Sequence, residues 1–274
     1  MDMDDQRFLK ACQLRDGGLF RKAIDEFFRI AEETTDPIDK AGVLLNVAAT
    51  FRALSEFDRA RMELKSARNL VASSNVLALS ALGDTRLVQL ELGLDFEEAD
   101  ISGYEGKLDE ALAKFDLLLK KYEPSLKIPE LRESYEMIQA RRGFILADLG
   151  RCKEALPILE EAESFKERRA EIYFYLGHCY LTDREYEKSA TKLAKALKLE
   201  LPRSLEFRAH CELGIAYYRL KDYAPAKLEF ERSAETADKE YVQQAQIWKW
   251  LENTSRALGL KDQAEHYAKL ASAS

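Results

Sequence analysis

Two histidine–cysteine pairs, His178-Cys179 and His210-Cys211, are the residues of this chain whose types could do chemistry. Imidazole and thiolate groups are ligands of Zn²⁺, and His178 and Cys211 could fall on the same side of neighbouring helices. Their spacing matches no zinc module, however, and further ligands are not evident. Catalysis by His178 would also need a nucleophile and an orienting carboxylate, which the sequence does not place beside it. We therefore interpret the cysteines as core thiols and His178 as a residue that lines a groove.

The sequence motifs of common enzyme classes are missing as well. The chain has no Gly-x-x-x-x-Gly-Lys-Ser/Thr, no Gly-x-Gly-x-x-Gly and no Gly-x-Ser-x-Gly. Adjacent carboxylates such as Glu160-Glu161 are expected on helix surfaces. The sequence therefore predicts a protein that is not an enzyme and that holds neither a cofactor nor a metal.

Around the two pairs, one pattern is written twice. Tyr173-x-x-Leu176-Gly177-x-x-Tyr180 is followed 37 residues later by Leu213-Gly214-x-x-Tyr217. Each copy continues with an aromatic, a small, a bulky apolar and another small residue, namely Tyr186, Ser189, Leu193 and Ala196, then Tyr223, Ala226, Phe230 and Ser233. Self-similarity at this period marks a repeat array. The glycines would let two antiparallel helices approach closely, and the tyrosines could fill space between neighbouring repeats.

This pattern resembles the tetratricopeptide repeat, a helix-turn-helix unit. The resemblance implies an all-α fold, a right-handed α-solenoid, since one helical hairpin cannot bury both of its faces and must stack on neighbours. We expect one domain over residues 1–274, and about seven hairpins over residues 5–37, 40–74, 75–123, 130–166, 170–202, 206–238 and 241–273. The second helix of the last hairpin is mostly polar or small, as a capping element requires.

The third hairpin departs from the pattern. Its first helix fits Leu79, Leu82 and Gly83, but Ala111, which opens its second helix, comes sixteen residues late. Because the intervening residues keep a helical spacing, we expect an extended first helix that projects past the solenoid; an ordered loop or insertion over about 95–106 is the alternative. Its carboxylates form what we call the acidic spur: Glu91, Asp95, Glu97, Glu98, Asp100 and Glu105. They are either a solvated helix face or a docking site for a basic partner.

The resemblance further implies a concave groove lined by the first helices, where such proteins usually bind an extended peptide or a helix. Projecting the pattern onto the later hairpins gives the groove residues Arg141, Phe144, Phe174, Tyr175, His178, Arg208, Arg219, Lys249, Trp250, Asn253 and Arg256, with Glu212 opposing them. The chain beyond Pro124 has equal numbers of basic and acidic residues, so cations gathered on one face would favour acidic segments, with aromatic side chains supplying most of the affinity. The alternative is that these are solvated helix faces and packing aromatics.

Composition narrows the function further. A formal net charge of −7 disfavours binding to nucleic acid, and the apolar runs are too short for membrane insertion. The acidic start does not resemble a secretory signal and the four cysteines are widely spread, so we expect free thiols and a cytoplasmic protein. We interpret the chain as a protein-interaction scaffold or adaptor that binds an acidic or helical peptide segment of a partner. The alternatives are a peptide-sensing signalling regulator and an adaptor that docks a basic partner on the acidic spur.

Overall fold

The computed structural model describes residues 6–73, 85–123, 125, 128–165, 170–199, 201–236 and 244–273. All regular secondary structure in these ranges is helical, which confirms the all-α prediction. The chain divides into two compact units, Met1–Ile145 and Leu146–Ser274. A single domain over the whole length stays a prediction.

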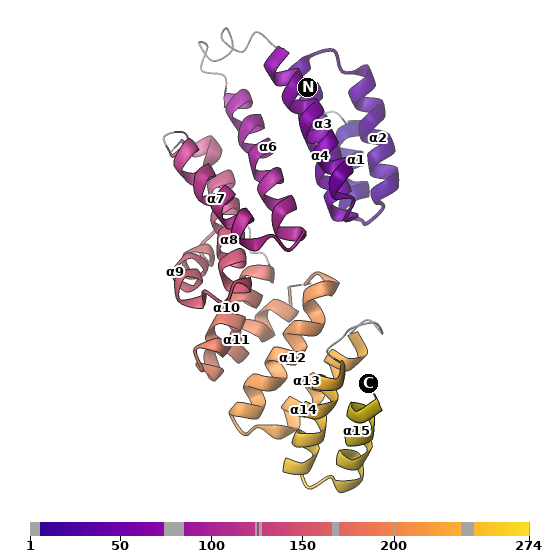
Figure 1. Ribbon diagram of the computed structural model, residues 1–274, viewed down its shortest axis with the longest axis vertical. Helices are drawn as coiled ribbons and strands as arrows, with labels where there is room; N and C mark the ends of the chain where they lie inside the picture. The colour runs from indigo at the N-terminus through magenta and orange to yellow at the C-terminus, as the bar shows by residue number, and fades with distance from the viewer. Residues whose placement is uncertain are drawn as a thin grey trace. The chain divides into compact units, whose positions relative to one another are not determined.

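The N-terminal unit is built from consecutive helical hairpins (Figure 1). Its helices are α1 (Gln6–Asp16), α2 (Phe20–Glu33), α3 (Pro37–Ala53), α4 (Phe57–Ser73), α6 (Thr85–Tyr104), α7 (Leu108–Tyr122), a short 3-10 helix (Pro129–Leu131) and most of α8 (Arg132–Asp148). Within hairpins, α1 packs on α2, α3 on α4 and α6 on α7; between hairpins, α2 contacts α3, and α6 contacts both α3 and α4. Each hairpin thus covers a face of the next one.

The C-terminal unit repeats this arrangement. It contains the last residues of α8, then α9 (Cys152–Ala162), α10 (Ala170–Thr182), α11 (Tyr186–Leu197), α12 (Arg203–Arg219), α13 (Tyr223–Thr236), α14 (Gln244–Ala257) and α15 (Lys261–Ala273). The pairs α10–α11, α12–α13 and α14–α15 form the hairpins, and α12 also contacts α10 and α14. First helices of successive hairpins therefore lie next to one another (Figure 1).

The described hairpin turns share one backbone conformation. One residue has a positive φ, for example Gly18 at 75° and Arg184 at 64°. The amide after it bonds back to the carbonyl five residues earlier, as Leu19 N to Leu14 O at 2.8 Å does, which is the Schellman ending of a helix. The residues with positive φ are Gly18, Ser55, Gly106, Gly150, Arg184, Lys221 and Gly259. In the described part of the chain there are thus seven such turns, the number of hairpins that the sequence predicts.

Close approach within hairpins occurs at the predicted glycines. A methyl group added to Gly177 would lie 2.5 Å from Leu193 Cγ, and one added to Gly214 would lie 2.7 Å from ring carbons of Phe230. At the same level, Ser189 Oγ donates a hydrogen bond to the carbonyl of Gly177 at 2.8 Å. Because these residues are small, the side chain of Leu193 in α11 packs directly on the backbone of α10. The ring of Phe230 in α13 packs on the backbone of α12 in the same way.

The third hairpin has an ordinary register, which the sequence analysis missed. Ala99 lies twelve residues before Ala111, the same separation as between Gly177 and Ser189, and both alanines are fully buried. α6 is indeed the longest of the described helices, with 20 residues. It continues to Tyr104, through all but the last two residues of the segment for which a loop was the alternative. It turns directly into α7 at Gly106. The expected first-helix residues near 79–83 lie outside the described residues.

The last helix has the wettable outer surface expected of a cap. Only Ala264 is fully covered among the described side chains of α15, and the following residues are exposed: Lys261, Asp262, Gln263, Glu265 and His266. Tyr267 packs inward, stacked on Trp248 with ring centroids 6.1 Å apart. α15 therefore presents mostly polar side chains to solvent.

Candidate functional site

The acidic spur does not stand free of the fold. Glu97 is 4% exposed and Asp100 is 3% exposed, since α6 packs on α3. Arg52 of α3 donates from Nε to Glu97 Oε1 at 2.5 Å, and its Nη1 lies 3.3 Å from Asp100 Oδ2. The prediction that these carboxylates project past the solenoid is wrong. They face inward because buried arginines neutralise them.

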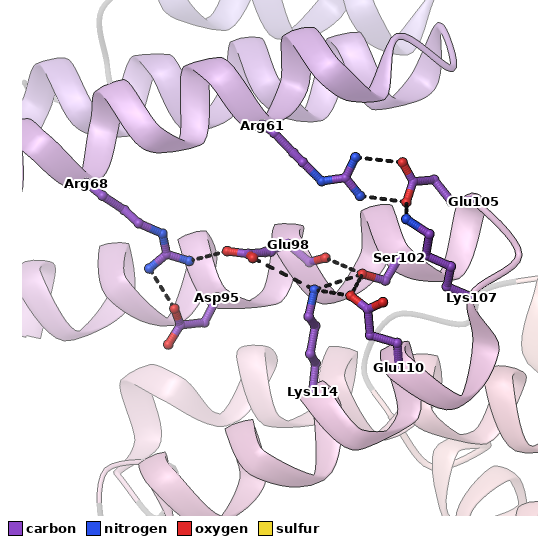
Figure 2. A network of polar contacts seen from close by, with 9 residues as sticks. All are labelled: Arg61, Arg68, Asp95, Glu98, Ser102, Glu105, Lys107, Glu110 and Lys114. Atoms are coloured by element: carbon purple, nitrogen blue, oxygen red, sulfur yellow. Dashed lines mark hydrogen bonds and ion pairs between the residues drawn. The ribbon is translucent and has the colours of Figure 1, made fainter.

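The opposite face of α6 carries a second set of ion pairs. Figure 2 shows Arg68 reaching from α4 to Asp95 and Glu98 of α6, and Arg61 reaching from α4 to Glu105 in the turn after α6. Arg68 donates to Asp95 Oδ1 at 2.8 Å and to Glu98 Oε2 at 2.9 Å, and Arg61 makes two 2.6 Å bonds to Glu105. Hydrogen bonds from Arg61 and Lys107 lower the pKa of Glu105 to about 2. Within the acidic spur, Glu91 included, no side chain is fully exposed, so we do not propose it as a docking site.

Two predicted groove residues, Arg141 and Phe144, pack inside the N-terminal unit. Arg141 Nε lies 3.2 Å from Asp100 Oδ1, and its guanidinium stands over the ring of Tyr104 at 5.5 Å. Phe144 is 4% exposed. Neither side chain can therefore supply the open cation or the accessible aromatic that the sequence analysis expected.

Two further aromatic groove residues are also core residues. Phe174 is fully buried and Tyr175 is 7% exposed. The hydroxyl of Tyr175 donates to Asp148 Oδ2 at 2.9 Å, which holds the end of α8 against α10. The expectation that they anchor a partner is wrong, because the neighbouring helices already cover them.

His178 and Arg208, in contrast, meet at the surface of the C-terminal unit. His178 Nδ1 lies 3.0 Å from Glu212 Oε1, and Arg208 lies 3.6 Å from Asp148 Oδ1 and 3.9 Å from Glu212 Oε1. Burial disfavours the imidazolium, but the hydrogen bond and charge of Glu212 outweigh it and raise the pKa of His178. The guanidinium of Arg208 stands 5.1 Å from the ring centroid of Phe174. Side chains of α8, α10 and α12 thus form one polar cluster.

The histidine–cysteine pairs separate in the structure. His178 bonds to Glu212, whereas His210 bonds to the buried Glu229 with Nδ1 and Oε2 2.6 Å apart. All four cysteines are free thiols, as predicted, and burial raises the pKa of Cys211 to about 12. No three His, Cys, Asp or Glu side chains of the described residues are arranged to hold a metal ion.

A pocket of about 440 Å³ opens beside the polar cluster, between α12 and α14. It is lined by Phe207, Arg208, Cys211, Glu212, Ile215, Gln246, Ile247 and Trp250. The sequence analysis singled out Arg208 and Trp250 and named Glu212 as opposing them. The apolar walls, Phe207, Ile215 and Ile247, were missed. Ile215 lies one turn after Glu212 and Ile247 lies one turn before Trp250, and this spacing was the available signal. Phe207 directly precedes Arg208 and had no such signal.

Aromatic and cationic side chains lie next to Trp250, one wall of the pocket. Trp250 stacks on Phe230, with centroids 5.6 Å apart and ring planes 11° apart, and the guanidinium of Arg219 lies 5.9 Å from the Trp250 ring centroid. Lys249 follows Gln246 by one helical turn. Both Arg219 and Lys249 are exposed, and neither forms an ion pair with a described residue. These two cations therefore keep their charge available to a ligand.

The remaining groove residues lie further along α14. Arg256 Nη2 is 2.6 Å from Glu252 Oε1, so its charge is already balanced on its own helix. Asn253 is half-buried one turn after Lys249. The open cations of this surface are thus fewer than the sequence suggested.

Comparison with solved structures decides the fold. The chain matches no family model and no curated protein sequence. A tetratricopeptide repeat protein from Parabacteroides merdae superposes with a TM-score of 0.52 at 12% identity, over 98% of this chain and 92% of that one. This chain has the tetratricopeptide-repeat fold. The same fold relates it to Cut9–Hcn1 of the APC/C hetero-tetramer, with a TM-score of 0.67 at 15% identity, over 97% of this chain and 45% of that chain.

A third solved structure is similar to this chain. The structure of PilF from Pseudomonas aeruginosa matches with a TM-score of 0.60 at 15% identity, over 84% of this chain and 90% of that one. The described helices of the present repeat protein include none that is long and apolar enough to cross a membrane.

Proposed function

We propose that this tetratricopeptide-repeat chain is a protein-interaction scaffold, and that its C-terminal unit binds an acidic segment of another protein across α12 and α14. The observation that carries the proposal is a pocket with an aromatic wall, Trp250, and two cations close to that tryptophan. Arg219 lies over its ring and Lys249 precedes it in the chain, and neither has a carboxylate partner among the described residues.

The fold supports a role in binding proteins. First helices of successive hairpins present a row of side chains that is held rigid by the second helices behind it, so little entropy is lost when a partner binds. A structure with the same fold belongs to a hetero-tetramer, Cut9–Hcn1. For the present chain this supports a partner protein rather than a small metabolite.

The charges support an acidic partner. A guanidinium over an indole ring is pre-oriented, since the stacking on Trp250 limits its rotamers. A carboxylate that approaches Arg219 gains a charge-assisted bond, and Lys249 adds a second positive charge nearby on α14. Trp250 supplies apolar area at the centre, where aromatic side chains contribute most to affinity.

The proposal can be tested with an array of 12-residue peptides whose net charges range from strongly acidic to strongly basic, probed with the full chain. We expect bound peptides to be acidic, and their titration to change the emission of Trp250. The double variant Arg219→Glu, Lys249→Glu should lose this binding at least about tenfold, because it removes two charge-assisted contacts.

A matched control separates a local effect from net charge. Lys22→Glu with Lys65→Glu reverses two exposed lysines of the N-terminal unit that have no ion pair with a described residue, and it makes the same change in net charge. It should bind the acidic peptides as the unaltered chain does. Bound peptides without an acidic bias, or equal losses in both double variants, would overturn the proposal.

A further inference from the structure

The pocket between α12 and α14 has accessible apolar walls. Phe207, Ile215 and Trp250 line it and are only half-buried, so apolar surface remains open there. Trp250 is held in place, since it stacks on Phe230 and the ring of Tyr218 packs against it with centroids 5.2 Å apart. Exposed apolar surface is stabilised when another apolar group covers it. The walls therefore favour an uncharged, apolar side chain as the occupant.

A carboxylate is disfavoured inside the same pocket. Glu212 lines it and carries the same charge, and burying a second charge beside it would be costly. Arg208, the cation of the lining, already stands 3.6 Å from Asp148 Oδ1 and 3.9 Å from Glu212 Oε1. Arg219 and Lys249, which have no carboxylate partner among the described residues, lie outside the lining. The acidic residue of the partner and the residue that fills the pocket are therefore two different residues.

The lining also favours an aromatic occupant over an aliphatic one. The guanidinium of Arg208 lies 5.1 Å from the ring centroid of Phe174 and donates no hydrogen bond to any described residue. A guanidinium is planar and weakly hydrated, and it stacks well on aromatic rings. Trp250 offers an aromatic wall against which another ring can pack edge to face. An aliphatic side chain would cover the same walls without these two interactions.

We infer that the pocket takes an aromatic side chain of the partner, and that an acidic residue close to it in the partner's sequence contacts Arg219 and Lys249. Ile215 in the pocket lies one helical turn before Arg219, and Trp250 follows Lys249 directly. One turn is about 5.4 Å, which two residues of an extended chain or one turn of a helix span. The two partner residues should thus lie within about four positions of one another. This inference rests on the proposed function and adds a second determinant to charge.

The test starts from the tightest acidic peptide of the 12-residue array, re-synthesised with alanine at each position in turn and titrated against the unaltered chain. We expect losses at the acidic positions. At one aromatic position within about four residues of them we expect a loss of at least about tenfold, because buried aromatic anchors carry much of the affinity of such interfaces. Leucine at that position should bind about threefold to tenfold more weakly than the aromatic residue.

Variants of the chain locate the aromatic residue in the pocket. Ile215→Ala cuts back one wall, so replacing the aromatic residue of the peptide by alanine should cost at least about threefold less than it does with the unaltered chain. Leu228→Ala is the matched control, since Leu228 is 47% exposed on α13 and does not line the pocket, and the full cost should remain. Arg208→Gln should reduce the preference for the aromatic residue over leucine by at least about twofold.

The alanine scan uses the unaltered chain, so it decides the inference even if Ile215→Ala does not fold. An acidic binder without an aromatic residue, or one that tolerates alanine or leucine at every aromatic position, would overturn the inference while acidic binding stands. An equal cost of the peptide change in the unaltered chain and in a folded Ile215→Ala variant would do the same. An array with no acidic binders would overturn the proposed function and this inference together.

Discussion

Replacing Gly177 by alanine is the sharpest test of the packing argument. Gly177 lies in the middle of α10, where it faces α11. An added methyl would be 2.5 Å from Leu193 Cγ and 3.1 Å from the backbone nitrogen of Leu193. Non-bonded carbons normally meet at about 3.5–4.0 Å, so the two helices would have to separate by roughly 1 Å.

The expected magnitude is the difference of two effects. Overpacking of a well-packed contact costs about 1–3 kcal/mol, while alanine gains about 1 kcal/mol over glycine in a helix interior. The backbone nitrogen of Leu193 cannot rotate away as a flexible side chain could. The difference is a net loss of about 0–2 kcal/mol. We therefore expect Gly177→Ala to lower the free energy of unfolding by about 1–2 kcal/mol, the upper part of this difference.

Gly42→Ala is the matched control. It lies inside α3, and an added methyl would meet nothing within 4 Å, so we expect a gain of about 0.4–1 kcal/mol. Urea denaturation followed by far-ultraviolet circular dichroism would measure both variants. If Gly177→Ala were as stable as the unaltered chain, or gained as much as Gly42→Ala, the close approach of α10 and α11 would be refuted.

Two further predictions concern the charges of α6 and of the turn that follows it. Arg52→Met should destabilise the chain by about 3–5 kcal/mol at neutral pH, since it leaves Glu97 and Asp100 buried without their shared arginine; an unchanged urea midpoint would contradict this. Because its pKa in the folded chain lies near 2, below the usual value of 4.5 for a glutamate, Glu105 contributes stability that is present above about pH 4.5 and is lost as the pH falls toward 2. Glu105→Gln should remove that part of the acid dependence, and Arg61→Gln should reduce it, in melting curves recorded between pH 2 and pH 6; equal slopes for all three proteins would speak against the ion pair.

The repeat architecture could be predicted because it depends on local spacing. A small residue in the first helix and another one twelve positions later bring the two helices together, and Gly177 with Ser189 showed this plainly. In the third hairpin, Leu82-Gly83 matches the motif, but Ala99 has the correct separation from Ala111. The spacing of small residues, which packing requires, is thus a better guide to the register than the Leu-Gly motif.

The burial of the acidic residues could not be predicted from their own segment. Counted alone, this stretch has an excess of carboxylates, and an excess of charge normally indicates a solvated face. The neutralising groups come from other helices: Arg52 from α3, Arg68 from α4 and Arg141 from α8. Such tertiary pairing leaves no periodic signal in one sequence.

Groove residues were predicted in part for a similar reason. The pattern identified which faces belong to first helices, and Arg208 and Trp250 do line the pocket there. It could not tell that the next helix covers Phe174 and Tyr175. The exposure of a side chain in the groove depends on how far the neighbouring hairpins overlap. The sequence of a single helix does not determine this overlap.

The ion pairs between α4 and α6 also bear on how this chain could change its length in evolution. Repeat arrays commonly grow and shrink by duplication and loss of whole hairpins, which is harmless when every hairpin presents the same apolar face to its neighbour. Here α6 fits only behind a helix with arginines placed as Arg61 and Arg68 are. Deleting the second hairpin, or copying the third, would bring carboxylates against a surface without matching cations. The order of hairpins in the N-terminal unit is thus fixed by charge, and its members are not interchangeable modules.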